Sequence, residues 1–487
     1  MAIKFWNGSS GAFETAAAWS PAGIPVGGDY AIINSGLVTE GGAFADFLTL
    51  RLTGSASSSP RLDLAGATLP ATSRLEITGA GSSPAVQVEG QVTNLGTITV
   101  TSSAPGSATF LARDAANGAA TTLLNAGTIA ITDGIAQFLN FGGNATRMTN
   151  NGVVSVASTG ATASSAYVSL SVDGTGRTVI GNNSSVEFAA SVGAGQTVAF
   201  LPGTGSSVLE LDTAGTFQGT IKNLVSTDRV GFGAVSAPGV SYTSTSVAGG
   251  IVHVTSNGNA LVDLNVKGVY APTDFSIATT DLGGGRSDTF LTTTATDPLF
   301  NYTDSAAGTS GTVAADVYDG PVNYLQWQYI WDKADGVAIS ASRNNVFLHG
   351  GSGDDALAVQ GGNNVIDGGG GSNFLVGGKG ADGGTDTFFV DGRGGVVTWS
   401  SIVNFHHGDA VTVFGFTGGV STLPLTDNDG AAGYTGATIH SELSGAGTGV
   451  NGSVTFAGIS AADAQAKFTF SFGAVGGANY MQIAYTG

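Results

Sequence analysis

The sequence predicts an all-β protein, and three observations lead to that prediction. The chain has 487 residues, of which 78 are glycine, whereas glycine makes up about 7% of an average protein. Hydrophobic residues contribute 42% and charged residues only 10%, the reverse of the composition typical of disordered chains. Short stretches also alternate apolar and polar residues between glycines. Many short strands joined by tight turns account for all three observations.

Charge and cysteine content exclude several classes of protein. The formal net charge is −19, so the chain lacks the basic surface that nucleic-acid binding requires. There is no cysteine, which rules out disulfides and thiolate metal ligands. We expect no membrane span, because no run of 18 apolar residues occurs. The first residues also lack the apolar core of an N-terminal signal peptide.

The first element is the opening segment, "FWNGSSGAFETAAAWSPAGIPVGGDYAIINSG". Its Trp6, Trp19, Pro25 and Asp29 occupy the places that such residues hold at the start of autotransporter-like and adhesin β-helices, which the segment resembles. The resemblance implies a cap that protects the open end of a solenoid. The alternative is a pair of ordinary core tryptophans.

Repeats follow the cap. "VTNLGTITV", "LLNAGTIAI" and "MTNNGVVSV" share an asparagine before a turn and then an alternating strand, and "IGNNSSVEF" is a fainter copy. Their asparagines are Asn94, Asn125, Asn150 and Asn182, at intervals of 31, 25 and 32 residues. Periods of 20–50 residues indicate a solenoid, in which we expect each asparagine to stack on the next. With a closing segment at 215–232, residues 1–232 are predicted to form a β-solenoid.

Residues 233–316 are rich in Ser, Thr, Gly and Val but have no clear repeat. We expect a β-rich middle segment there.

The next element is a nine-residue repeat of the form G-G-x-G-x-D-x-U-x, where U is a large aliphatic residue. Its copies are "GGSGDDALA" from Gly350, "VQGGNNVID" from Val359, "GGGGSNFLV" from Gly368 and "GGKGADGGT" from Gly377. The sixth position is filled by Asp355, Asn364, Asn373 and Asp382, and the U position by Leu357, Ile366 and Leu375. Glycine permits a tight turn with inward carbonyl groups, and the sixth residue adds a side-chain oxygen. Such oxygen-rich turns suit Ca²⁺.

This repeat resembles the RTX nonapeptide of bacterial calcium-binding β-rolls. The resemblance implies that each calcium ion lies between turns two repeats apart, so that Asp355 pairs with Asn373 and Asn364 with Asp382. The candidate metal-site residues are Gly351, Gly353, Asp355, Asn364, Gly369, Gly371, Asn373, Gly378, Gly380 and Asp382. Two of the four sixth positions are Asn, which predicts weaker binding than in an all-Asp roll. A glycine-rich roll without metal is the alternative.

The flanking sequences extend this resemblance. Residues 317–400 read as the calcium roll with its flanks, and residues 401–487 as a C-terminal β region. RTX proteins leave the cell by type I secretion with an uncleaved C-terminal signal. The resemblance therefore implies an extracellular or cell-surface location without an N-terminal signal peptide.

No enzyme signature is found. H-E-x-x-H and G-x-S-x-G motifs do not occur, and His406, His407 and Asp409 are expected to form a turn and not a ligand cluster. In "YLQWQYIW" a stripe of Leu325, Trp327, Tyr329 and Trp331 is predicted to be core, with sugar stacking as the alternative.

Together these features predict a secreted structural calcium-binding protein that assembles with itself into a layer or filament. A surface polysaccharide is a further candidate partner. Two alternatives stay open, a carbohydrate-binding adhesin and a polysaccharide-modifying solenoid enzyme.

Overall fold

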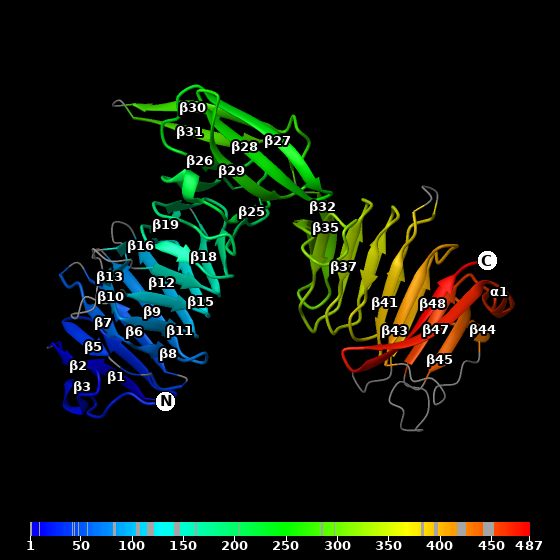
Figure 1. Cartoon of the computed structure of the whole chain (residues 1–487). Helices are drawn as coiled ribbons and strands as arrows, with labels where there is room; N and C mark the ends of the chain where they lie inside the picture. Colours follow the sequence, from blue (N-terminus) through cyan, green and yellow to red (C-terminus); the bar gives the residue numbers. More distant parts are fainter. Residues whose placement is uncertain are drawn as a thin grey trace. The chain divides into compact units, whose positions relative to one another are not determined.

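The chain forms two compact units, Met1–Thr296 and Asp297–Gly487 (Figure 1). The computed structural model describes residues 2–487 except 9, 41, 43, 47, 56, 81–83, 104–107, 114–120, 141–146, 161–162, 204, 284–285, 297, 381–383, 394–397, 416–424 and 442–451. Almost all regular structure in the described residues is β-strand. The helical elements described are α1 (Ala461–Lys467) and the short 3₁₀ turns η1 (Ala16–Ala18) and η2 (Ala214–Thr216). The all-β prediction is confirmed.

The first unit contains three sheets. The largest has 14 strands in the order β27 (Pro238–Ser246), β28 (Gly249–Ser256), β29 (Asn259–Lys267), β25 (Thr220–Lys222), β23 (Thr197–Phe200), β21 (Arg177–Ile180), β18 (Val153–Ala157), β15 (Thr128–Thr132), β12 (Thr97–Ser103), β9 (Arg74–Ala80), β6 (Thr49–Thr53), β4 (Tyr30–Ile33), β1 (Ile3–Trp6) and β3 (Trp19–Ser20). The second has 12 strands in the order β2 (Gly11–Ala12), β5 (Leu37–Glu40), β7 (Arg61–Ala65), β10 (Ala85–Glu89), β13 (Ala108–Arg113), β16 (Ile135–Asn140), β19 (Ser164–Val168), β22 (Ser184–Phe188), β24 (Ser207–Leu211), β26 (Asp228–Gly231), β31 (Arg286–Thr293) and β30 (Phe275–Gly283). The third has five strands in the order β20 (Ser171–Asp173), β17 (Arg147–Asn150), β14 (Thr122–Asn125), β11 (Gln91–Asn94) and β8 (Thr68–Leu69).

Successive strands of the first unit enter these sheets in rotation. After β9, β10 and β11 have entered the three sheets, β12 returns beside β9 and pairs with it in parallel. We call one such passage of the chain a circuit. Residues at equivalent places then lie in register, as Leu75, Ile98 and Ile129 do on neighbouring strands.

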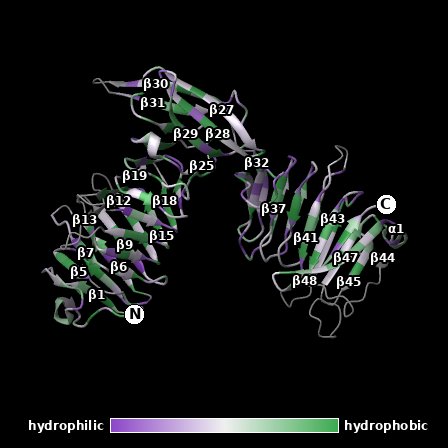
Figure 2. Ribbon diagram, in the orientation of Figure 1, coloured by the Kyte–Doolittle hydropathy of each residue, from purple (hydrophilic) through white to green (hydrophobic). Residues whose placement is uncertain are grey.

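Alternation of residues explains why these strands form. In β12 and β15 every second residue is buried, and Ile98, Val100, Ile129 and Ile131 contribute to one continuous core. Because successive side chains of a strand point to opposite faces, the polar threonines between them face outward. Figure 2 shows hydrophobic residues along the strands of both units.

The opening segment packs around two tryptophans. Trp6 and Trp19 are buried with their rings edge to face, 5.1 Å between centroids. The indole nitrogen of Trp19 donates to the carbonyl oxygen of Phe13 (2.8 Å), and Asp29 accepts from the backbone N–H groups of Ala2 and Val26. These contacts tie the segment to β1 and β4.

The segment 233–316 is divided between the two units. Strands β27–β29 continue the first sheet beyond β25, and β30 and β31 continue the second sheet beyond β26. Strands β32 (Leu299–Asp304) and β33 (Thr309–Ala314) belong to the second unit.

The second unit contains two sheets. One has nine strands in the order β33, β32, β36 (Val337–Ala341), β38 (Ala356–Val359), β40 (Phe374–Val376), β42 (Thr398–Val403), β46 (Gly452–Ala457), β45 (Gly436–Ser441) and β44 (Leu425–Asp429). The other has eight strands in the order β34 (Asp316–Val317), β35 (Trp327–Ile330), β37 (Val346–His349), β39 (Val365–Asp367), β41 (Thr387–Asp391), β43 (Ala410–Phe414), β48 (Ala478–Tyr485) and β47 (Phe468–Val475). From β36 to β43 successive strands alternate between the two sheets and pair in parallel, so one circuit here has two strands.

Candidate functional site

The sixth residues of the nonapeptides form a hydrogen-bonded ladder along the nine-stranded sheet. The N–H of Val337 donates to Oδ1 of Asp355 (2.8 Å), and the N–H of Asp355 donates to Oδ1 of Asn373 (2.9 Å). The N–H of Asn373 then donates to Oγ of Ser400 (3.2 Å). Asp355, Asn373 and Ser400 are buried, so the structure brings the predicted pair Asp355 and Asn373 together on neighbouring circuits.

A second ladder follows the eight-stranded sheet. Oδ1 of Asn364 accepts from the N–H of Val346 (3.0 Å), and Oδ1 of Asp386 accepts from the N–H of Asn364 (2.9 Å). Oδ1 of Asp409 accepts from the N–H of Asp386 (2.7 Å). Each side-chain oxygen thereby satisfies a buried backbone donor of the preceding circuit.

Asp386 holds the place after Asn364 that the nonapeptide register gives to Asp382. Asp382 lies outside the described residues, so its predicted pairing with Asn364 is not described. The displacement is four residues, because Phe388, and not the residue at position 384, pairs with Ile366 in the core row. The glycine-rich segment from Gly377 is therefore longer than one repeat.

The ladders also contain two residues that the sequence analysis did not assign to the repeat. Ser400 and Asp409 take sixth positions, and Ile402 and Val411 take the U positions beside Leu375 and Phe388. A signal for Asp409 exists in "NFHHGDAVT", in which Asp409 and the aliphatic Val411 are two residues apart, as the sixth and U positions of the nonapeptide are. His406 and Asp409 form the expected turn, in which the N–H of His406 donates to Oδ2 of Asp409 (3.0 Å).

Asp and Asn at the sixth position form turns with different hydrogen bonds. The second oxygen of Asp355 accepts from the N–H of Gly351 (3.0 Å), and that of Asp386 accepts from the N–H of Gly378 (2.7 Å). The amide of Asn364 instead donates to the carbonyl oxygen of Gly361 (2.7 Å). Asn373 does the same toward Gly370 (2.9 Å). An Asp turn thus presents an N–H group inward and an Asn turn presents a carbonyl group.

Burial raises the pKa of every carboxyl group in the ladders. For Asp355 and Asp386 burial raises the pKa more than the hydrogen bonds that both groups accept lower it. Burial raises the pKa of Asp409 to about 6. Ionised carboxylates are costly in such an environment unless a proton or a cation compensates their charge.

The turns stack so closely that only glycine fits. Gly369 and Gly371 have φ values of +65° and +77°, and a Cβ atom on them would overlap the carbonyl oxygens of Gly351 and Gly353. These carbonyl groups therefore face the next turn. The predicted residue Gly380 is different, because a Cβ there would overlap the imidazole of His406.

The two edges at which these turns stack differ in charge. On the first edge Gly353 lies against the backbone of Asp335 and Gly336, and Asp332 and Asp354 are exposed in the same turns. The described cations of this edge, Lys333 and Arg393, are paired with Asp304 and Asp391. On the second edge the described charged and imidazole side chains outside the ladder are Arg343, Lys379, His406 and His407. Because calcium prefers oxygen ligands, its chemistry fits the first edge and not the second.

No group of three or more His, Asp and Glu side chains among the described residues is already arranged to hold a metal ion. On the first edge the donors at hand are backbone carbonyl groups and the two remaining lone pairs of the Asp355 carboxylate. Any cation there must draw partly on the exposed carboxylates of Asp332, Asp335 or Asp354.

The first unit has its own ladder, built from amides. Nδ2 of Asn94 donates to Oδ1 of Asn125, and Nδ2 of Asn125 donates to Oδ1 of Asn150, both at 2.8 Å. Nδ2 of Asn150 then donates to Oε1 of Gln196 (3.1 Å). The stacking expected of the first three asparagines is confirmed.

Asn182 is the exception, and its predicted place in this ladder is wrong. It follows β21 of the 14-stranded sheet, whereas Asn94, Asn125 and Asn150 each end a strand of the five-stranded sheet. Its Oδ1 accepts from the N–H of Gly205 (3.2 Å). Asn182 therefore lies at a different corner of the circuit.

A carboxylate cluster on the 12-stranded sheet was not expected from the sequence. Tyr167, Glu187 and Glu210 lie side by side on β19, β22 and β24. Burial and the nearby carboxylates, first among them Asp288, raise the pKa of Glu210 to about 7. These residues are far apart in the chain, and only the parallel stacking brings them together.

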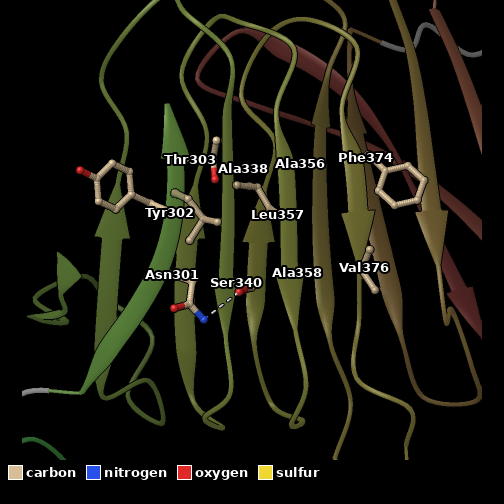
Figure 3. Close-up of a pocket in the computed structure, with 11 residues that line it drawn as sticks. Asn301, Tyr302, Thr303, Ala338, Ser340, Ala356, Leu357, Ala358, Phe374 and Val376 are labelled. Carbon is tan, nitrogen blue, oxygen red and sulfur yellow. Dashed lines mark hydrogen bonds between the residues drawn. The ribbon is translucent and has the colours of Figure 1, made fainter. Parts of the chain in front are cut away.

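A pocket of about 260 Å³ opens on the outer face of the nine-stranded sheet (Figure 3). Small residues on β36 and β38 lie between Asn301 and Tyr302 on one side and Phe374 and Val376 on the other. Asn301 and Ser340 share a long hydrogen bond (3.5 Å). The lining contains no carboxylate, imidazole or cation, so the pocket offers no acid–base chemistry.

Three of the four residues of the aromatic stripe before the nonapeptides are core, as expected, whereas Tyr329 is partly exposed. Leu325, Trp327 and Trp331 are buried, and the indole nitrogen of Trp331 donates to the carbonyl oxygen of Asp335 (2.8 Å). Trp331 thereby anchors the first turn of the stack. The two tryptophan rings are therefore not exposed for sugar stacking.

No helix in the described part of the chain is both long and apolar enough to cross a membrane. Comparison with protein-family models gives no match, and comparison with curated proteins gives none either.

Proposed function

We propose that the protein is an extracellular structural protein made of a β-solenoid and a calcium-stabilised β-roll. The observation that carries the proposal is the first edge, where the buried carboxylate of Asp355 lies among stacked glycine turns whose carbonyl groups face the next turn, beside the exposed carboxylates of Asp335 and Asp354. The turns on this edge are rich in oxygen atoms, and their cations Lys333 and Arg393 are paired with Asp304 and Asp391. The ladders, whose side chains satisfy buried backbone groups, support a structural role.

The first edge is where calcium would bind. The carbonyl groups of Gly351 and Gly353 face the following turn, and Asp355 retains free lone pairs. Asp335 and Asp354 lie in the two turns stacked beside them. Bound there, calcium would supply the positive charge that offsets the buried carboxylate of Asp355. The resemblance to RTX repeats supports the same metal and supports export by type I secretion with a C-terminal signal.

Calcium titration of the full chain tests this proposal. Calorimetry should show binding, and the melting temperature of the second unit should rise in calcium relative to chelator. The double variant Asp335→Ala/Asp354→Ala should lose at least about tenfold in affinity, since each removes a charged ligand next to the turns. Glu14→Ala, an exposed carboxylate in the first unit, is the control. Identical melting in calcium and chelator, with no heat of binding, would refute the proposal.

A carbohydrate-binding adhesin is the second candidate, favoured by rings on the outer face of the eight-stranded sheet. Phe347 and His349 are nearly parallel (16°), as are Phe389 and Phe414 (15°), and all four are partly exposed. Nδ1 of His349 and Oδ2 of Asp367 form a hydrogen bond (2.9 Å) between these pairs. Retardation of the chain in polysaccharide-containing gels, reduced by Phe389→Ala, would favour this role.

A further inference from the structure

The ends of the five sheets are protected unequally. A strand at the end of a sheet presents unpaired N–H and C=O groups, and proteins limit this with short strands, bulges, charges or proline. Five of the ten terminal strands are only two or three residues long, namely β2, β3, β8, β20 and β34. Three more contain a register shift, namely β27, β30 and β44.

The two remaining terminal strands, β33 and β47, have none of these protections. They are six and eight residues long, and each pairs with its neighbour without a register shift. Neither the segment 305–315 around β33 nor the segment 468–487 around β47 contains a charged residue or proline. In the described part of the chain, both strands are last in their sheets.

These two strands lie at opposite ends of the second unit. β33 begins the nine-stranded sheet, next to the first circuit, and β47 ends the eight-stranded sheet, beyond the last circuit. A contact between two different surfaces of identical chains is heterologous, and it repeats without closing unless its rotation forms a ring.

We propose that β33 of one copy pairs with β47 of a second copy, which joins the chains head to tail into a filament. The occupant of each edge is thus a second copy of this chain. Uncharged edges favour this contact because copies with a net charge of −19 repel one another elsewhere. The inference goes beyond the proposed function: it names the surfaces through which the self-assembly expected from the sequence would occur.

The contact is short, so it should be weak. Six paired residues bury less than the roughly 1,200 Å² of a standard interface. Association should therefore depend on concentration and become visible in sedimentation velocity at tens to hundreds of micromolar. The experiment uses the full chain with millimolar calcium.

Two edge variants test the pairing. Ser310→Lys/Thr312→Lys places charge on β33, and Thr469→Lys/Ser471→Lys places it on β47; all four side chains are exposed. Each variant alone should remain monomeric, because one of the two required edges is blocked. An equimolar mixture should give dimers that do not grow, because one open edge of each kind remains. Asn259→Lys/Asn265→Lys, on the internal strand β29, has the same charge change and should assemble like the unmodified chain.

Several outcomes would overturn the proposal. These are a monomeric unmodified chain at the highest concentration, growth of either edge variant alone, and a mixture that stays monomeric. Dimers of the β47 variant alone would indicate pairing of β33 with itself. Loss of calcium stabilisation would instead refute the proposed function, and it would leave the sedimentation result readable.

Discussion

In both units a ladder of hydrogen-bonded side chains connects successive circuits, but the two ladders are built from different groups. In the first unit, the amides of Asn125 and Asn150 both donate and accept and that of Asn94 donates, so the ladder is neutral and its side chains bond to one another. In the second unit, Asp355 and Asp386 only accept, so each depends on backbone donors. Carboxyl groups therefore accumulate along the ladders of the second unit and not along that of the first. The comparison teaches that a carboxylate ladder links stability to protons and cations, whereas an amide ladder does not.

The largest effect should come from removing one carboxylate. Asp386 accepts from the backbone N–H groups of Asn364 and Gly378 and from the amide of Asn364. Asp386→Ala leaves buried donors unsatisfied and should lower the free energy of unfolding of the second unit by about 3–5 kcal/mol. Asn125→Ala in the amide ladder should cost the first unit about 2 kcal/mol. Hydrogen exchange with urea reads the two units separately; equal losses would erase the distinction between the ladders.

A smaller and more specific effect should come from adding a charge. Asn364→Asp places an oxygen against the carbonyl group of Gly361 and against Oδ1 of Asp386, where the amide now donates. We expect a loss of about 2–3 kcal/mol in chelator at neutral pH. Asn125→Asp should cost the first unit a similar amount.

The two Asp variants should also differ from each other in a way that thermal unfolding can measure. Both should recover stability at about pH 4, where the new carboxyl group is protonated. Calcium should leave the Asn125→Asp variant unchanged. Calcium recovery of Asn364→Asp would show that the second edge also admits the metal, against the charge distribution there.

The smallest effect concerns pH. Asp409 and Glu210 have folded pKa values of about 6 and about 7, above those of unfolded chains. Their contribution to stability is complete below about pH 4 and is lost as pH rises through the folded pKa. The second unit should thus weaken between about pH 4 and 6 in chelator, and the first between about pH 4.5 and 7.

The Glu210→Gln variant isolates the contribution of Glu210 to the pH dependence of the first unit's stability. It should flatten that unit's pH profile and stabilise it at pH 7.5 by about 1 kcal/mol, a modest gain because solvent screens this partly open cluster. Salt should shrink the Glu210 effect but not that of the buried Asp409. A profile that Glu210→Gln leaves unchanged would show that the cluster is not the source.

Local sequence patterns were enough to predict the all-β fold and part of both ladders. Asn94, Asn125 and Asn150 were predicted to stack because each precedes the same turn and strand. Asp355 and Asn373 were placed together because the nonapeptide keeps its spacing between them. These features repeat at a constant distance along the chain, which is what a sequence displays directly.

The features that the sequence did not reveal depend on repeat spacing that varies or on pairing between strands far apart in the chain. Asp386 lies four residues beyond its expected position because the glycine-rich segment is longer than one repeat. Asn182 shares the asparagine signal but falls at another corner. The cluster around Glu210 and the two unprotected edges follow from which strands become neighbours, and that is decided by the whole unit.

Each step of the ladder is the same hydrogen bond (here called the joint), in which a backbone N–H of one circuit donates to a side-chain oxygen of the next circuit. Val337 donates to Asp355 and Asp355 donates to Asn373, each time across 18 residues. Removing residues 350–367 would leave the N–H of Val337 facing the oxygen of Asn373, with the joint intact. The unit can therefore change its length in whole steps of 18 residues, each adding about 4.8 Å. The length of such a unit is therefore set by the number of repeats that its gene encodes, because each added repeat pair folds onto the same joint.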